Sequence, residues 1–300
     1  MERNNKELIK GTAAIGFSAI LWGFDGVVLT PRLHGLDVGY VVFMLHFIPF
    51  VLMNIFMFNE YKQLKNFFRQ DYITFSLIAV FGGAMGTMAM VKALFLVNFQ
   101  ELSVVVLLQK LQPIFAISLA AILLKEKIKK NFIFWAGLAI VASYFLTFGI
   151  SLPNMHTDRN TVYAALLAVL AAFSFGSSTV FSKKALMNFN FKTATFFRYG
   201  FTSVIMLVYV LVFGKYTQIA QTSEIHWFLF VLIGLTTGSG AIFIYYFGLR
   251  RVRAMEATIS ELLFPISAIF FDYVVNGSIM SPVQLISAAV MVFAIIKLNN

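Results

Sequence analysis

Two apolar stretches of the sequence contain polar side chains followed by a proline. They read LLQKLQPIF, around Pro113, and ISELLFPIS, around Pro265. A proline inside a helix removes one backbone hydrogen bond and frees the carbonyl four residues earlier. Pro113 would free the carbonyl of Gln109, and Pro265 would free that of Glu261. The sequence therefore predicts two helix kinks, each with an exposed carbonyl and a polar side chain.

Further ionisable side chains lie inside the apolar stretches, namely Asp25, His46, Lys110 and Arg198. Such groups are expensive in lipid and usually face the interior of a helix bundle or a wet cavity. Trp22 also lies too deep in its stretch to be an interfacial tryptophan. The predicted substrate-binding residues of this polar path are Trp22, Asp25, His46, Gln109, Lys110 and Glu261.

The chemistry of these residues is that of binding rather than catalysis. Lys110 suits a carboxylate, Asp25 or Glu261 suits an ammonium group, and an aromatic face such as that of Trp22 suits an apolar or cationic group. No serine, histidine and acid arrangement suggests hydrolysis, and no glycine-rich phosphate loop suggests an ATP motor. The four histidines lack metal-ligand spacing. We therefore predict no enzyme, no cofactor and no metal site.

Depth along the helices predicts which charges meet. At a rise of about 1.5 Å per residue, Arg198 and Glu261 both lie ~6 Å from the midpoints of their predicted spans, on the same side of the membrane centre. We predict that they pair as a gate or a structural ion pair, with substrate contact as the alternative. An outer cluster of Asp25, His46, Lys92, Gln109 and Lys110 is also predicted, in which Lys110 either holds substrate or supports its helix.

Composition places the chain in a membrane. Of its 300 residues, 60% are hydrophobic and only 12% are charged, too few to cover a water-exposed surface. Apolar runs of about 20 residues, the length that crosses a bilayer, recur from end to end. The ten predicted spans are Gly11–Thr30, Gly39–Phe58, Thr74–Val97, Leu102–Leu124, Phe132–Phe148, Thr161–Ser182, Phe191–Phe213, His226–Gly248, Ala254–Val275 and Pro282–Ile296.

The net charge of +10 lies in short Lys and Arg clusters between these spans, which argues against a nucleic-acid partner. If the N-terminus is cytoplasmic, 17 of the cations outside the spans lie on the cytoplasmic side. The three on the opposite side are Arg32, Arg159 and Lys215. Because such a bias orients membrane proteins, we predict a bacterial inner-membrane protein with both termini in the cytoplasm.

The two halves of the chain resemble each other. A shift of 152 residues aligns PIFAI with PISAI, and Gln109 with Glu261. We therefore predict a first repeat over residues 1–150 and a second over residues 151–300. Each repeat has five spans, an odd number, so the second enters the membrane from the opposite side. An all-α inverted repeat around a central cavity is typical of secondary transporters.

Several motifs in this order give the chain a resemblance to the EamA family of the drug/metabolite transporter superfamily. The first half has WG in its first span, proline in its fourth, and Glu126 in LLKEK at the end of that span. The second half adds FSFGSSTVFSKKAL, FFRYGF and Pro265. The sequence departs from the family pattern at His46, opposite Arg198, and at VVNGS. The resemblance implies a cavity walled by helices 1, 3, 4, 6, 8 and 9, with helices 5 and 10 peripheral.

The resulting hypothesis is a secondary transporter that moves a small organic metabolite by alternating access. The resemblance favours export of an amino-acid-like zwitterion. Uptake of a quaternary amine or a vitamin is the alternative within this class, and a lipid-handling protein or membrane enzyme is the rival outside it. The expected partners are a small molecule and the lipid bilayer. Proton coupling and the choice between monomer and homodimer stay open.

Overall fold

A computed structural model describes residues 5–97, 105, 108–152, 159–277, 279 and 281–298. Across these ranges the chain is helical and forms no strand. Eight helices are long and apolar enough to cross a membrane: Asn5–Leu33, Val38–Asn66, Arg69–Leu96, Lys130–Phe148, Arg159–Asn188, Phe191–Val212, Glu224–Leu249 and Ala254–Val275. The chain is therefore an all-helical, multi-pass membrane protein.

Two shorter apolar helices, Gln112–Leu123 and Pro282–Leu298, coincide with the fourth and tenth predicted spans. The N-terminal part of the fourth predicted span lies largely outside the described residues. The count of ten spans therefore stays a prediction.

The α-helices of the two halves have the following bounds. Those of the first half are α1 (Asn5–Phe24), α2 (Val38–Met57), α3 (Arg69–Ile78), α4 (Gly86–Leu96), α6 (Gln112–Leu123) and α7 (Lys130–Phe148). Those of the second half are α8 (Arg159–Asn188), α9 (Phe191–Val212), α10 (Glu224–Ile233), α11 (Ser239–Leu249), α12 (Ala254–Ser260), α13 (Leu263–Asn276) and α14 (Pro282–Leu298).

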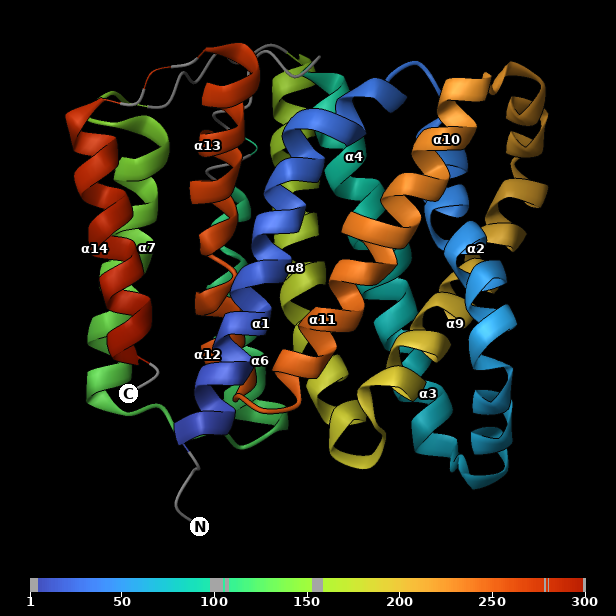
Figure 1. Ribbon diagram of the computed structural model, residues 1–300, viewed down its shortest axis with the longest axis horizontal. Coiled ribbons are helices and arrows are strands. Elements are labelled where there is room, and N and C mark those ends of the chain that lie inside the picture. The colour runs from blue at the N-terminus through green and yellow to red at the C-terminus, as the bar shows by residue number, and fades with distance from the viewer. Residues whose placement is uncertain are drawn as a thin grey trace.

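The two halves of the chain interleave (Figure 1). Helix α1 packs against α11 and α13 of the second half, whereas α8 packs against α4 and α6 of the first. At one edge of the bundle α7 packs against α14, and toward the other edge α2 packs against α9. The start of α1 and the end of α14 lie at the same end of the bundle. Helices α1 and α8 are therefore the elements through which each half packs against the other.

A cluster of phenylalanine rings fills the space among α3, α8 and α9. The ring centroid of Phe67 lies 5.3 Å from that of Phe75, 4.9 Å from that of Phe189 and 4.8 Å from that of Phe197. Phe75 is fully buried. Such aromatic contacts add to the stabilisation from burial alone, so this part of the bundle is firmly packed.

Three spans widen into π-helical segments: η1 (Asp25–Leu29), η4 (Ala79–Met85) and η6 (Gly234–Gly238). Glycines let these segments approach their neighbours closely. A Cβ on Gly82 would overlap the Ser178 hydroxyl, and one on Gly234 would lie 2.9 Å from Pro49. Single π turns inside α-helices frequently mark functional sites, which draws attention to the space between these segments.

The two spans predicted to kink at Pro113 and Pro265 are interrupted near those positions, whereas α2 runs without a break through Pro49. Turn residues Lys110 and Leu111 precede α6, and Glu261 and Leu262 separate α12 from α13. The predicted exposed carbonyl of Glu261 is not free, because it accepts a hydrogen bond of 2.9 Å from the backbone N–H of Phe264. The Glu261 carbonyl, which Pro265 cannot bond, thus closes a tighter turn with the residue three positions later.

An ion pair joins the loop before α2 to the segment after α9. Asp37 Oδ2 lies 2.9 Å from Lys215 Nζ, and Asp37 Oδ1 accepts hydrogen bonds from the N–H groups of Gly39 and Tyr40 at the start of α2. Burial raises the pKa of Asp37, but Lys215 and these N–H donors outweigh it, so the pKa lies below its usual value. Asp37 in turn raises the pKa of Lys215.

This ion pair predicts a specific pH dependence of stability. Its contribution is present between the ordinary pKa values of 3.8 and 10.5, and it is lost as Asp37 protonates below that window or Lys215 deprotonates above it. Thermal unfolding of wild type and Asp37→Asn should therefore differ at pH 7 and converge in acid. An equal difference at both pH values would contradict the assignment. Asp37→Ala also removes the helix cap, which typically costs about 1 kcal/mol.

Candidate functional site

A cavity of about 340 Å³ lies between the three π-helical segments and the two interrupted helices. This volume falls within the ~300–1,000 Å³ range of small-molecule sites. All six residues predicted to bind substrate line it, and so do Arg198, Pro113 and Pro265. Among the described residues, α7 and α14 contribute nothing to the lining, as the family resemblance implies for helices 5 and 10. The implied set of wall helices is incomplete, however, because His46 of α2 and Arg198 of α9 also line the cavity.

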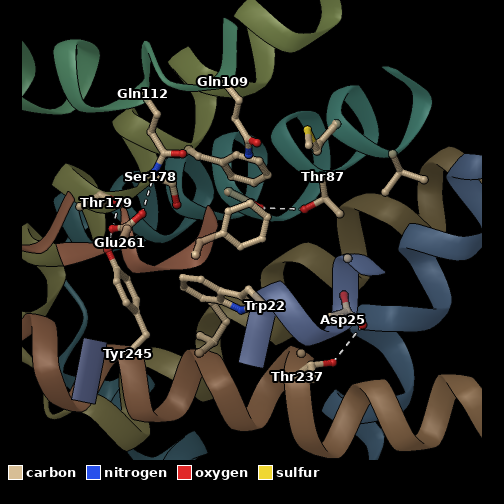
Figure 2. A pocket seen from close by; sticks show the side chains of 18 of the residues that line it. Trp22, Asp25, Thr87, Gln109, Gln112, Ser178, Thr179, Thr237, Tyr245 and Glu261 are labelled. Atoms are coloured by element: carbon tan, nitrogen blue, oxygen red, sulfur yellow. Dashed lines mark hydrogen bonds between the residues drawn. The ribbon is translucent and has the colours of Figure 1, made fainter. Parts of the chain in front are cut away.

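One end of the cavity is built around the carboxylate of Glu261 (Figure 2). Tyr245 Oη donates to Oε1 at 2.5 Å, and Gln112 Nε2 donates to Oε2 at 2.7 Å. Tyr245 Oη also lies 3.0 Å from Thr179 Oγ1 on α8. Because Glu261 sits where α12 gives way to α13, this network ties the interrupted helix to α6, α8 and α11.

The other end of the cavity is built around Asp25 (Figure 2). Thr30 Oγ1 donates to Asp25 Oδ2 at 2.9 Å, and Thr237 Oγ1 donates to Oδ1 at 3.1 Å. Asp25 belongs to η1 and Thr237 to η6, so the carboxylate links two π-helical segments. No Lys or Arg side chain of the described residues lies within 4.0 Å of this carboxylate.

An aromatic surface separates the two carboxylates. In Figure 2 the indole of Trp22 lies between the Glu261 end and the Asp25 end. Its ring centroid is 5.4 Å from that of Tyr245, with the planes tilted by 53°. Phe175 and Phe264 also line the cavity. The cavity thus offers flat apolar faces in the middle and hydrogen-bonding groups at both ends.

Arg198 and Glu261 both line the cavity, but the structure does not join them in an ion pair. The guanidinium Nη1 of Arg198 donates to Tyr246 Oη at 3.1 Å, and Tyr246 Oη lies 2.6 Å from Ser182 Oγ. Glu261 is held by Tyr245 instead. Consecutive residues of an α-helix point about 100° apart, so the neighbouring tyrosines of α11 present their hydroxyls to different partners.

The predicted outer cluster is dispersed. Lys110 Nζ donates to Ser143 Oγ on α7 at 2.7 Å. His46 Nδ1 lies 2.8 Å from the carbonyl oxygen of Val42, one turn earlier in the same helix. In the part of the chain that the structure describes, no hydrogen bond or ion pair joins Asp25, His46, Lys92, Gln109 and Lys110 to one another, and Lys92 does not line the cavity. The other four share the cavity wall without forming one network.

Several uncharged residues line the cavity but were not predicted as site residues from the sequence. They are Thr30, Gln112, Ser178, Thr179, Thr237, Tyr245 and Thr258. Hydroxyl side chains are common in membrane helices, where they bond to backbone or neighbouring helices. Residue type alone therefore does not identify them as cavity residues, although Gln112 lies directly before Pro113 in the polar stretch LLQKLQPIF.

The charged groups on the cavity wall are balanced. Two acids, Asp25 and Glu261, and two bases, Lys110 and Arg198, are the Asp, Glu, Lys and Arg residues among the described lining. Within the described ranges, no cluster of three or more His, Asp or Glu side chains is arranged to hold a metal ion. The geometry suits a small organic ligand with an aromatic body and polar ends.

Known proteins are similar to this chain in sequence or in fold. Residues 9–148 and 162–299 each match the EamA-like transporter family. The chain is 50% identical to a Fusobacterium nucleatum protein named riboflavin transporter ImpX. The alignment of 293 residues covers 97% of this chain and 98% of the Fusobacterium protein. The chain is 22% identical to the uncharacterized transporter YoaV of Bacillus subtilis, over 89% of this chain and 88% of the relative. A solved crystal structure superposes over 95% of both chains with a TM-score of 0.68 at 17% identity, which shows a common fold.

Proposed function

Because this chain belongs to the EamA-like transporter family of the drug/metabolite transporter superfamily, we propose that it carries riboflavin or a closely similar flavin across the bacterial plasma membrane. The observation that carries the proposal is the riboflavin transporter at 50% identity, which matches 97% of this chain. That match extends over nearly all the helices that line the cavity.

The chemistry of the cavity supports a flavin. Riboflavin has a flat aromatic ring system, a dione edge with carbonyl oxygens at one end of it, and a polyhydroxylated ribityl chain on its central ring. Trp22 offers a stacking surface for the ring system, and such stacking tolerates any flat conjugated ligand. The hydrogen-bonding groups around Glu261 and Asp25 lie at separate places in the cavity, which suits a ligand with two separate polar groups.

The amino-acid-like zwitterion that the sequence resemblance favoured has less support than the vitamin alternative. The relative that is 50% identical over 97% of this chain is named as a transporter of riboflavin, which is a vitamin and not a zwitterion.

The packing of the halves supports an inverted repeat of residues 1–150 and 151–300 that works by alternating access. Helix α1 packs against two helices of the second half, and α8 packs against two helices of the first in the corresponding way. The family also matches each half separately, at residues 9–148 and 162–299. The common position of the start of α1 and the end of α14 at one end of the bundle is compatible with two cytoplasmic termini (Figure 1).

Transport by the purified protein in liposomes tests this proposal. We expect saturable entry of labelled riboflavin that unlabelled riboflavin and lumiflavin inhibit, whereas amino acids and choline do not. Lumiflavin shares the ring system and carries a methyl group in place of the ribityl chain. Liposomes without protein supply the control. Movement of an amino acid or choline in the absence of riboflavin movement would overturn the assignment.

A further inference from the structure

The side-chain amide of Gln109 has no hydrogen-bond partner among the described residues, although the residue lines the cavity. Gln109 is half-buried, and its amide atoms are not among the buried polar atoms that the protein seals off. In Figure 2 its side chain runs from its helix toward the interior of the pocket. A molecule in the cavity can therefore reach a donor and an acceptor that the described protein groups leave free.

Amide side chains are rare on this wall. Gln109 and Gln112 are the two amides among the described lining residues. The Nε2 of Gln112 already donates to Glu261 Oε2 at 2.7 Å. Gln109 is therefore the amide whose carbonyl oxygen and NH2 group can both bind a ligand.

The charged groups on the wall offer acceptors or donors but not both. The ionised carboxylates of Asp25 and Glu261 only accept hydrogen bonds, whereas the cationic side chains on the wall only donate them. An amide presents an acceptor and a donor side by side, because its oxygen and its nitrogen share one carbon atom. Gln109 thus suits a ligand edge on which an N–H group lies beside a carbonyl group.

The dione edge of a flavin has this arrangement, because its ring N3–H lies between two carbonyl groups. We propose that the Gln109 amide binds that edge through a pair of hydrogen bonds. The amide oxygen accepts from N3–H, and the NH2 group donates to an adjacent carbonyl oxygen. This inference rests on the proposed function. It makes Gln109 a residue that recognises the ring system of the substrate rather than its ribityl chain.

Riboflavin and its N3-methyl derivative test the contact from the ligand side, with the protein unchanged. The methyl group replaces the N3 hydrogen and keeps the amide away from this edge. Wild type should bind N3-methylriboflavin with a Kd about 5- to 100-fold higher than that for riboflavin, as expected for the loss of a pair of ordinary hydrogen bonds. Equal Kd values for the two ligands would overturn the inference.

Gln109→Leu tests the same contact from the protein side. Because the removed amide has no partner among the described residues, thermal stability without ligand should not fall. The variant should bind riboflavin and lumiflavin more weakly than wild type by the same factor, since both carry the dione edge. It should also no longer distinguish riboflavin from N3-methylriboflavin. Gln70→Leu, which removes an exposed amide outside the cavity, is the control and should bind like wild type.

The other outcomes separate this inference from the proposed function. Weakening of riboflavin alone would place Gln109 at the ribityl chain and overturn the assignment, as would a Gln109→Leu protein that binds like Gln70→Leu. A preference for riboflavin over N3-methylriboflavin that persists in Gln109→Leu would show a steric effect of the methyl group and also overturn it. If wild type does not bind riboflavin, the proposed function fails. If Gln109→Leu does not fold, the pair of ligands measured on wild type decides.

Discussion

Replacing Trp22 with alanine should weaken riboflavin binding by about tenfold to a hundredfold. The indole lies in the middle of the cavity, between the Glu261 and Asp25 ends and 5.4 Å from the ring of Tyr245. Stacking of a flat ring on an aromatic side chain is worth about 1–3 kcal/mol by alanine substitution. The measurement is a titration of flavin fluorescence with purified protein. Trp22→Phe should keep a large part of the affinity.

The chain supplies its own controls for this experiment. Of its three tryptophans, Trp135 and Trp227 do not line the cavity. Trp135→Ala and Trp227→Ala should leave riboflavin affinity near that of wild type. A Trp22→Ala protein that binds as tightly as Trp227→Ala would remove the indole from the binding site.

Replacing Glu261 with alanine should destabilise the protein and abolish transport. The carboxylate accepts hydrogen bonds from Tyr245 and Gln112. Its removal leaves the Gln112 amide without this acceptor, whereas Tyr245 can still bond to Thr179. An unsatisfied group costs about 1–3 kcal/mol, so the loss should be about 1–3 kcal/mol if water does not enter. The measurement is thermal unfolding in detergent beside transport in liposomes.

Glu261→Gln is the matched variant, because its amide keeps one acceptor oxygen and the same shape. It should retain most of the stability that Glu261→Ala loses. Normal stability together with lost transport would show that the carboxylate acts in the transport cycle, as a proton or substrate site. An alanine variant that unfolds at the wild-type temperature would contradict the structural role of the network.

The cavity residues that sequence alone could predict were recognisable from their depth in an apolar span or from a nearby proline. Asp25, Lys110 and Glu261 are ionisable and lie deep in apolar spans, where only the bundle interior can receive them. Trp22 was predicted from its depth for a related reason. Gln109 was found through its position four residues before Pro113. These five, together with His46, line the cavity.

The contacts between these residues could not be predicted in the same way. Sequence gives depth along a helix, but it does not give the direction in which a side chain points across the bundle. Arg198 and Glu261 were matched in depth, yet each bonds to a different tyrosine of α11. The same limit explains why Lys110 reaches Ser143 on the peripheral helix α7 instead of joining Asp25.

The fold shows a similar division between what is predictable and what is not. Helix interruptions next to Pro113 and Pro265 follow from the missing N–H group of proline. The π-helical segments η1, η4 and η6 do not, because no single residue type requires a π turn. They arise from packing against neighbouring helices, as the close approach of Gly82 to Ser178 illustrates.

The balance of two acids and two bases on the cavity wall has an electrical consequence. Moving one elementary charge through a membrane potential of 100 mV changes the free energy by about 2.3 kcal/mol. In a cycle that moves no ion with the substrate, a neutral flavin carried between walls whose formal charges cancel transfers no net charge. The voltage across the membrane then neither drives nor opposes such a cycle. Accumulation inside a cell would depend on the concentration gradient alone, and therefore on how fast a reaction on the inner side converts the vitamin into a form that this cavity does not accept.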